Sequence, residues 1–234
     1  MKAVLRLRRS RERRRSGLFV AEGRREVERA LAAGLTPAAV YWAPELLPGW
    51  DGGGEQVTAR VMARMAYRDE PEGVLAVLEA PERPLPPAPT LLLVAAGIEK
   101  PGNLGALARS AAAAGADGLL VAEAEADPWN PNAIRASTGA VFTLPVVETD
   151  LETVAALQLQ RVAAVVDATL PFTSADLTPP TAILVGAEDT GLPEQWRAAA
   201  DIQVSIPMRP GTVDSLNASV AAAVLIFEAV RQRA

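Results

Sequence analysis

The sequence predicts an α/β protein with two domains, and three observations point to this. Short apolar runs alternate with helix-like segments along the whole chain. Hydrophobic residues make up 50% of the 234 residues, which is enough to bury a core. The alternation is interrupted at residues 81–89, where prolines fix φ and donate no hydrogen bond. We therefore expect one domain at residues 1–80, a semi-rigid connector at 81–89 and a second domain at 90–234.

The first domain is expected to form a small α/β sandwich behind an arginine-rich opening helix. Short β-branched and apolar runs predict its strands, Gly34 ends its first amphipathic helix, and Gly52 to Gly54 mark a turn. The predicted strands are residues 18–20, 38–42 and 73–78, and the predicted helices are residues 24–33 and 58–67.

The second domain is expected to contain a parallel sheet with helices on both faces. Its strand candidates are continuous apolar runs, as is typical of strands buried on both sides. The predicted strands are residues 91–95, 118–121, 162–166 and 183–185, and residues 206–208 are also β-like before a Pro/Gly turn. The predicted helices are residues 104–114, 151–160, 193–199 and 216–233. Ligands of such sheets bind beyond the carboxyl ends of the strands.

The composition excludes several kinds of chemistry. The chain has no cysteine and no histidine, so disulfides, Cys/His zinc sites and imidazole-dependent triads are excluded, and no metal is expected. Aromatic residues make up 4% of the chain, so base stacking is not an obvious recognition mode. No apolar run approaches the roughly 20 residues of a membrane span, and we expect a soluble, cytoplasmic protein with no membrane partner.

The charge is distributed unevenly. Residues 1–25 contain ten basic side chains and two acidic ones, although the formal net charge of the whole chain is −5. Clustered Arg and Lys side chains bind phosphates, so this end of the chain indicates a nucleic-acid contact. The alternative is a solvated helix without a ligand.

A polar segment follows the strand predicted at residues 91–95. The spacing Gly102-x-x-Gly105 matches neither a dinucleotide fingerprint nor a P-loop. Asn103 is suited to cap the next helix. Helical side chains lean toward the helix start, so we expect Arg109 to reach over the bare Gly105 toward an anion. An ordinary surface role for Arg109 is the alternative.

Two further segments lie where a ligand is expected. Gly186 and Gly191 flank Glu188 after a strand, and glycine lets a backbone turn tightly against a ligand. Ser215 and Asn217 open the last helix, where they either cap it or bind a ligand. Residues 132–142 add Arg135, Ser137 and Gly139 to the same half of the domain.

Together these segments resemble the SpoU branch of the SPOUT superfamily of RNA ribose methyltransferases. The resemblance covers residues 90–234 and is carried by three motifs in order. They are Asn103-Leu104-Gly105 with Arg109, Gly186-Ala187-Glu188-Asp189-Thr190-Gly191, and Ile206-Pro207-Met208 with Ser215-Leu216-Asn217. The first domain, with Glu22-Gly23 after a basic helix and a strand, looks like the L30e-type RNA-binding domain that often precedes this catalytic domain.

The resemblance implies a deep trefoil knot, a homodimer and S-adenosylmethionine bound near Gly186, Ile206 and Leu216. Arg109 is then the catalytic arginine, either as a base or as a phosphate anchor. The second role is physically easier, because guanidinium stays protonated. Asn103, Glu188, Ser215 and Asn217 are implied to position the ribose, the phosphate and Arg109. Lys100 departs from the pattern, since many relatives have Asn there.

The expected function is therefore S-adenosylmethionine-dependent methylation of a ribose 2′-hydroxyl in RNA. An L30e-like domain favours structured ribosomal RNA, with 23S rRNA as the first choice and tRNA as the alternative. A catalytically inactive RNA-binding homologue and a base methyltransferase are the other possibilities. A dinucleotide-dependent oxidoreductase is disfavoured, because its glycine fingerprint is missing.

Overall fold

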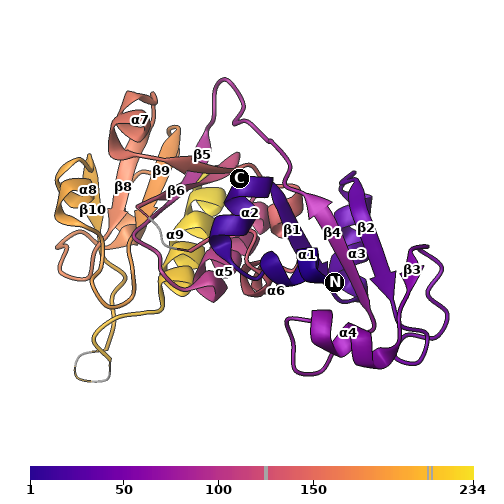
Figure 1. The fold of residues 1–234 in the computed structure, drawn as a ribbon. Coiled ribbons are helices and arrows are strands. Elements are labelled where there is room, and N and C mark those ends of the chain that lie inside the picture. The colour runs from indigo at the N-terminus through magenta and orange to yellow at the C-terminus, as the bar shows by residue number, and fades with distance from the viewer. Residues whose placement is uncertain (124–125, 210, 212) are drawn as a thin grey trace.

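The computed structural model describes residues 1–123, 126–209, 211 and 213–234, and these residues form two sheets joined by an irregular proline-rich segment. Figure 1 shows the smaller sheet and the larger sheet as two lobes, with the N-terminal helices lying between them. The predicted fold class is confirmed in these terms, with a parallel six-stranded sheet preceded by a smaller α/β domain. The trefoil knot stays a prediction of the resemblance.

The smaller sheet has the strand order β1-β4-β2-β3, with β4 antiparallel to both β1 and β2. The elements of this domain are α1 (Lys2–Arg6), α2 (Ser10–Ser16), β1 (Leu18–Glu22), α3 (Arg24–Ala32), β2 (Pro37–Trp42), β3 (Glu55–Gln56), α4 (Ala59–Met65) and β4 (Val74–Glu79). Thr58 caps α4 by accepting a hydrogen bond from the Val61 N–H.

The larger sheet is parallel throughout and has the strand order β10-β8-β9-β5-β6-β7. Its elements are β5 (Leu91–Ala96), α5 (Pro101–Ala113), β6 (Gly118–Ala122), α6 (Pro131–Ser137), η1 (Ala140–Phe142), β7 (Val146–Thr149), α7 (Leu151–Ala156), β8 (Gln160–Ala164), η2 (Phe172–Ser174), β9 (Thr181–Val185), α8 (Glu194–Ala198), β10 (Ile202–Val204) and α9 (Ala218–Gln232). Side chains of β5 alternate between two cores, one shared with α5, α6 and α9 and the other with α7 and α8.

Four element predictions were wrong in detail. The helix predicted at residues 104–114 begins at Pro101 with Lys100 as its N-cap, so Asn103 lies inside the helix and does not cap it. The helix predicted at residues 151–160 ends at Ala156, because Gln160 already donates a hydrogen bond to the Pro180 carbonyl at the start of β8. For the same reason β8 begins two residues before the predicted strand. Residues 206–208 form no strand, since β10 ends at Val204, and the Pro/Gly turn after them lies partly outside the described residues.

The close approach of α5 and α6 explains Gly105. A Cβ atom at Gly105 would lie 2.2 Å from the Ala133 carbonyl oxygen and 2.8 Å from the Ala136 Cβ. Gly105 is therefore covered by α6, and the expectation that Arg109 reaches across a bare glycine surface is wrong. The glycine is needed for helix packing rather than for the reach of the arginine.

The two domains share an extensive interface. Arg13 of α2 and Asp127 of the larger domain form a buried ion pair of 2.7 Å, with side chains only 2% and 5% exposed. Phe19 of β1 stacks on Trp129 with ring centroids 4.7 Å apart. Arg83 of the connector donates hydrogen bonds to carbonyl groups of both domains, at Phe142 and Ala33. The predicted connector is thus tied down on both sides.

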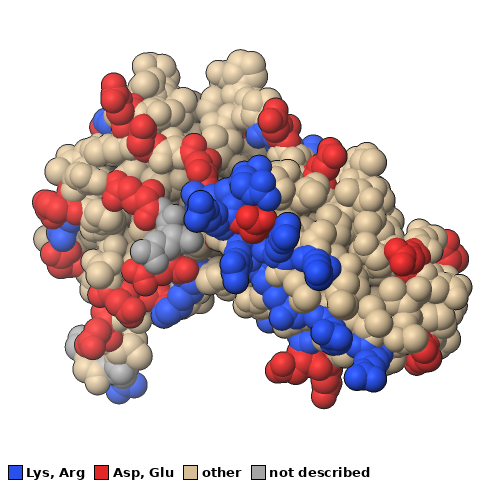
Figure 2. Space-filling model, viewed as in Figure 1, with Lys and Arg blue, Asp and Glu red and all other residues tan. Residues whose placement is uncertain are grey.

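Part of the basic N-terminus serves this interface rather than solvent. Arg13 is buried, and Arg14 pairs with Glu148 of β7 across the domain boundary at 3.2 Å. Arg6, Arg9 and Arg11 remain exposed and, with Arg15, surround an open hollow of about 670 Å³. Figure 2 shows Lys and Arg side chains gathered over these helices and continuing along the smaller domain.

Candidate active site

A cavity of about 340 Å³ lies beyond the carboxyl ends of the strands in one half of the larger sheet. Its walls come from the ends of β8, β9 and β10 and from the segment before α9. Gly186, Ile206 and Leu216 line it, as do Glu188 and Ser215. A cavity of this size with few polar groups is typical of a small-molecule site.

The turn from Gly186 to Gly191 forms one wall of this cavity. Ala187 and Gly191 exchange two backbone hydrogen bonds of 3.0 and 3.1 Å, which pulls the ends of the turn together. A Cβ at Gly186 would lie 2.1 Å from the Gly191 carbonyl oxygen, so only glycine fits there. The turn thereby presents backbone groups directly to the cavity.

A polar cluster adjoins the cavity where α5, the turn and α9 meet. Lys100 Nζ lies 2.6 Å from Glu188 Oε2, and the side-chain amide of Asn217 donates to the other carboxylate oxygen of Glu188. The same amide nitrogen lies 3.1 Å from Asn103 Oδ1. Three segments far apart in the sequence thus bring their polar side chains into one hydrogen-bonded group.

Asn217 caps α9 and belongs to the cluster at the same time. Its Oδ1 accepts hydrogen bonds from the backbone N–H and the hydroxyl of Ser219, at 3.0 and 2.6 Å. Its amide nitrogen is then left to face Glu188 and Asn103. Capping and site formation were alternatives in the sequence, and in the structure one side chain does both.

The cluster favours an ionised Glu188. Hydrogen bonding from Lys100, and secondly from Asn103, holds the pKa of the Glu188 carboxyl below its usual range. Glu188 in turn raises the pKa of Lys100. The pair is partly exposed, with side chains 60% and 21% accessible, so a charged ligand has access to either partner.

Arg109 and Ser215 lie outside this hydrogen-bonded cluster. Arg109 is exposed on α5, six residues beyond Asn103, which is about 9 Å along a helix axis. The described residues offer its guanidinium no hydrogen bond or ion pair. Ser215 is exposed at the cavity wall. The structure therefore gathers Asn103, Glu188 and Asn217 and leaves Arg109 available at the surface.

Sequence reasoning missed several cavity residues. Met208 and Val166 line the cavity, and Val166 is 61% exposed although it is apolar. Apolar walls suit the organic part of a cofactor. Met208 stood in a quoted motif, whereas Val166 follows a strand whose end was placed two residues too late. Only the observed end of β8 identifies Val166 as a cavity residue.

The described residues offer neither a membrane span nor a metal site. No helix in the described part of the chain is long and apolar enough to cross a membrane. Outside the undescribed positions 124, 125, 210 and 212, no group of three or more Asp and Glu side chains is arranged to hold a metal ion.

Comparison with known proteins identifies the family. Residues 90–227 match the model of the SpoU rRNA methylase family, and residues 1–76 match an MRM3-like substrate binding domain. The chain is 33% identical to the 23S rRNA (uridine(2479)-2′-O)-methyltransferase of Streptomyces viridochromogenes, over 95% of this chain and 85% of the relative.

Two solved structures match along nearly the whole chain. One is an RNA 2′-O ribose methyltransferase, with 41% identity and a TM-score of 0.86 over 99% of this chain and 95% of that one. The other is the SpoU methyltransferase AviRb from Streptomyces viridochromogenes in complex with the cofactor AdoMet, with 30% identity and a TM-score of 0.85 over 99% and 97%. The chain belongs to the SpoU rRNA methylase family.

Proposed function

We propose that this protein transfers a methyl group from S-adenosylmethionine to a ribose 2′-hydroxyl of RNA, with 23S rRNA as the substrate. The observation that carries the proposal is the cavity beside the Asn103–Glu188–Asn217 cluster. The full-length likeness to a 23S rRNA 2′-O-methyltransferase supports the substrate, because it includes the smaller domain as well as the catalytic one.

The cavity suits the cofactor. Gly186, Ile206 and Leu216 supply a backbone turn and apolar walls, and a Cβ at Gly186 would clash with Gly191 and disrupt the turn that forms one wall. When bound, S-adenosylmethionine supplies an electrophilic methyl group. We assign these three residues to cofactor binding.

The polar residues have the task of placing the ribose. A ribose hydroxyl is a weak acid, so its oxygen must be held in line with the methyl group while its proton leaves. Glu188 accepts hydrogen bonds, whereas Asn103, Ser215 and Asn217 each donate and accept them, and together they orient the hydroxyl and its neighbours. Arg109 anchors a substrate phosphate, because its guanidinium is exposed and permanently charged.

Each part of the chain has its own role in this proposal. We assign substrate RNA binding to residues 1–80, connection to residues 81–89 and catalysis to residues 90–234. The exposed arginines of α1 and α2 support the first assignment. We also place the protein in the cytoplasm, where ribosomal RNA is modified in bacteria.

A homodimer completes the proposal. Val220 and Phe227 on α9 are 48% and 46% exposed, and Val224 lies between them on the same side of the helix. This exposed apolar stripe suits burial against a second copy.

The decisive experiment is methyl transfer to a 23S rRNA transcript by Arg109→Ala, with nucleoside mass spectrometry of the product. We expect kcat/KM to fall about 100-fold through lost positioning, with the same cofactor affinity by calorimetry and the same circular dichroism. Arg161→Ala is the matched control, because Arg161 pairs with Asp201 at the amino ends of β8 and β10, whereas the cavity lies at their carboxyl ends. A wild-type rate in Arg109→Ala would show that Arg109 has no part in the mechanism. A product methylated on the base would overturn the proposal of ribose methylation.

A further inference from the structure

A second group of polar side chains lies at the junction of the two domains, outside the candidate active site. Glu22 of β1, with Tyr67 and Arg68 after α4, meets Asn132 and Arg135 of α6. They surround a small cavity of about 10 Å³, close to the volume that holds one water-sized group. The site exists only because both domains contribute to it.

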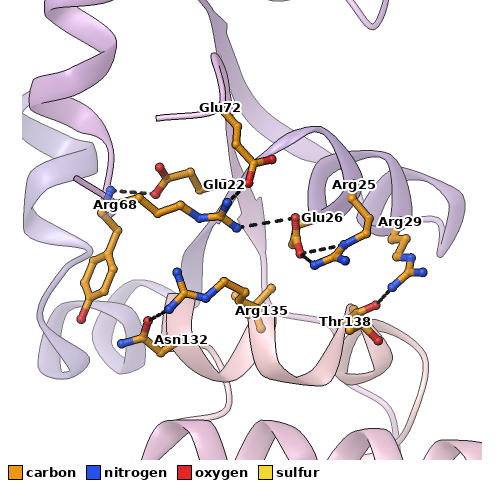
Figure 3. A network of polar contacts seen from close by, with 12 residues as sticks. Glu22, Arg25, Glu26, Arg29, Arg68, Glu72, Asn132, Arg135 and Thr138 are labelled. Carbon is orange, nitrogen blue, oxygen red and sulfur yellow. Dashed lines mark hydrogen bonds and ion pairs between the residues drawn. The ribbon is translucent and has the colours of Figure 1, made fainter. Parts of the chain in front are cut away.

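Two guanidinium groups face this junction from opposite domains. Arg135 donates to Asn132 Oδ1 at 2.8 Å and has no carboxylate within ion-pair distance among the described residues. Arg68 pairs with Glu72 and lies 3.9 Å from Glu26. Figure 3 shows Arg68 reaching between these two carboxylates and Arg135 lying against Asn132 on the neighbouring ribbon of the larger domain. Because Arg68 is already paired, Arg135 is the guanidinium at this junction that can bind a phosphate.

Glu22 presents an unused acceptor to the same cavity. The residue is only 5% exposed, and its Oε2 accepts a hydrogen bond of 2.7 Å from the Tyr67 backbone N–H. Its Oε1 has no hydrogen-bond partner in the described part of the chain. A buried polar atom without a partner is costly, and a ligand that donates a hydrogen bond removes that cost.

Tyr67 adds an aromatic surface. Its side chain is 38% exposed, and Tyr67 and Phe227 are the exposed aromatic residues among those described. The backbone just before Tyr67 is held by Arg8, in the turn between α1 and α2, which donates to the Ala66 and Arg64 carbonyl groups. The basic N-terminal segment therefore contacts the backbone beside this aromatic residue.

We propose that the junction is an RNA subsite that binds one nucleotide of the substrate at a distance from the methylated ribose. Arg135 binds its phosphate and Tyr67 stacks on its base, while a single donor group of the nucleotide enters the small cavity and donates a hydrogen bond to Glu22. Phosphate, aromatic and acceptor contacts together describe a nucleotide rather than a simple anion. The inference rests on the proposed function only in taking RNA as the substrate.

The test is the affinity of the whole protein for a 23S rRNA transcript, measured by filter binding at several salt concentrations. Arg135→Gln is expected to weaken binding roughly tenfold at 0.15 M salt and to lower the slope of log K against log salt by about 0.7 to 0.9, the loss of one phosphate contact. Tyr67→Leu is expected to weaken binding about tenfold with an unchanged slope, because stacking releases no counterions.

Arg24→Gln is the matched control, since Arg24 is an exposed helical arginine of the smaller domain that is already paired with Glu28. It is expected to bind the transcript within twofold of wild type. Equal losses in Arg24→Gln and Arg135→Gln would mean general charge attraction and would overturn the subsite. So would wild-type affinity in both Arg135→Gln and Tyr67→Leu.

Photochemical cross-linking tests the subsite without a measurement of affinity. A transcript containing 4-thiouridine is expected to cross-link to the peptide that carries Tyr67, and cross-links only to other regions would contradict the subsite. The outcomes separate the two proposals. A transcript that binds through the junction without being methylated would refute the proposed function alone, whereas normal methylation with no effect of the junction variants would refute the subsite alone.

Discussion

Arg13 and Asp127 join the two domains through an ion pair from which water is almost completely excluded. The Arg13 Nε and terminal nitrogen both lie 2.7 Å from Asp127 Oδ2. Ser10 donates to the same oxygen, and the other oxygen of Asp127 accepts from the Trp129 N–H. A pair of this kind fixes the relative orientation of the domains more strongly than any exposed contact.

We expect Asp127→Asn to lower the free energy of unfolding by about 3 to 5 kcal/mol, because it leaves the Arg13 charge buried without a partner. Urea denaturation measures this. Glu148→Gln is the control, since it removes a cross-domain pair that is 53% and 67% exposed and should cost less than about 1 kcal/mol. Equal effects of the two substitutions would show that burial of the Arg13 pair is unimportant.

The packing of α5 on α6 leads to a second prediction. Gly105→Ala should lower the free energy of unfolding by about 1 to 3 kcal/mol, because the new methyl group meets backbone of α6 at 2.2 Å. Gly102→Ala changes the same helix at a position with nothing within 4 Å, and should be neutral or stabilising by up to about 1 kcal/mol. Thermal unfolding of both variants is the measurement, and a stabilised Gly105→Ala would contradict the contact.

Two glutamates should give opposite pH dependences of stability. Burial raises the pKa of Glu22 above 4.5, so the protonated carboxyl favours the folded state. Its contribution to the free energy of unfolding is full below about pH 4.5 and is lost as the pH rises through the folded pKa. Arg231 lowers the pKa of Glu228 to about 2, so the ionised carboxylate favours the folded state. The contribution of Glu228 to the free energy of unfolding is full above about pH 4.5 and is lost as the pH falls toward 2.

Unfolding free energies between pH 3 and pH 8 test these directions. Relative to wild type, Glu22→Gln should gain stability as the pH rises from about 4.5, while Glu228→Gln should lose most above about pH 4.5 and approach wild type in acid. Parallel curves for both variants and the wild type would refute the assigned shifts.

The apolar stripe of Val220, Val224 and Phe227 on α9 predicts the effect of a charge introduced into it. Phe227→Asp should convert a dimer into a monomer, because an unpaired carboxylate cannot be buried against the partner. Sedimentation velocity at several concentrations measures the change. Leu46→Asp introduces the same charge at a residue of the smaller domain that is 39% exposed, and should leave the assembly unchanged. A monomeric wild type would rule out the proposed interface.

The sequence predicted the fold well where a signal is local. Buried parallel strands such as β5 and β9 stand out as apolar runs, and Thr58 and Asn217 are side-chain caps of recognisable type. The end of α7 was missed, because it depends on the pairing of Gln160 with a strand that lies twenty residues later.

The candidate active site also combines features with a local sequence signal and features that depend on distant residues. The glycines of the turn at 186–191 are recognisable because they are needed by the backbone itself. The pairing of Lys100 with Glu188 joins two loops that are 88 residues apart, and no local pattern contains it. The burial of Arg13 is similar, since its sequence neighbours are exposed arginines and only the opposing domain distinguishes it.

The buried contact between the domains has one more consequence, for how a nucleotide is chosen. In the function proposed above, a protein whose two domains are fixed to each other works as a ruler, because the distance from the RNA-binding surface to the cavity that receives the ribose is constant. A ribosomal RNA then offers only the ribose that its own folding sets at that span. Selection by length alone tolerates changes in the surrounding bases but not in the three-dimensional shape that carries them.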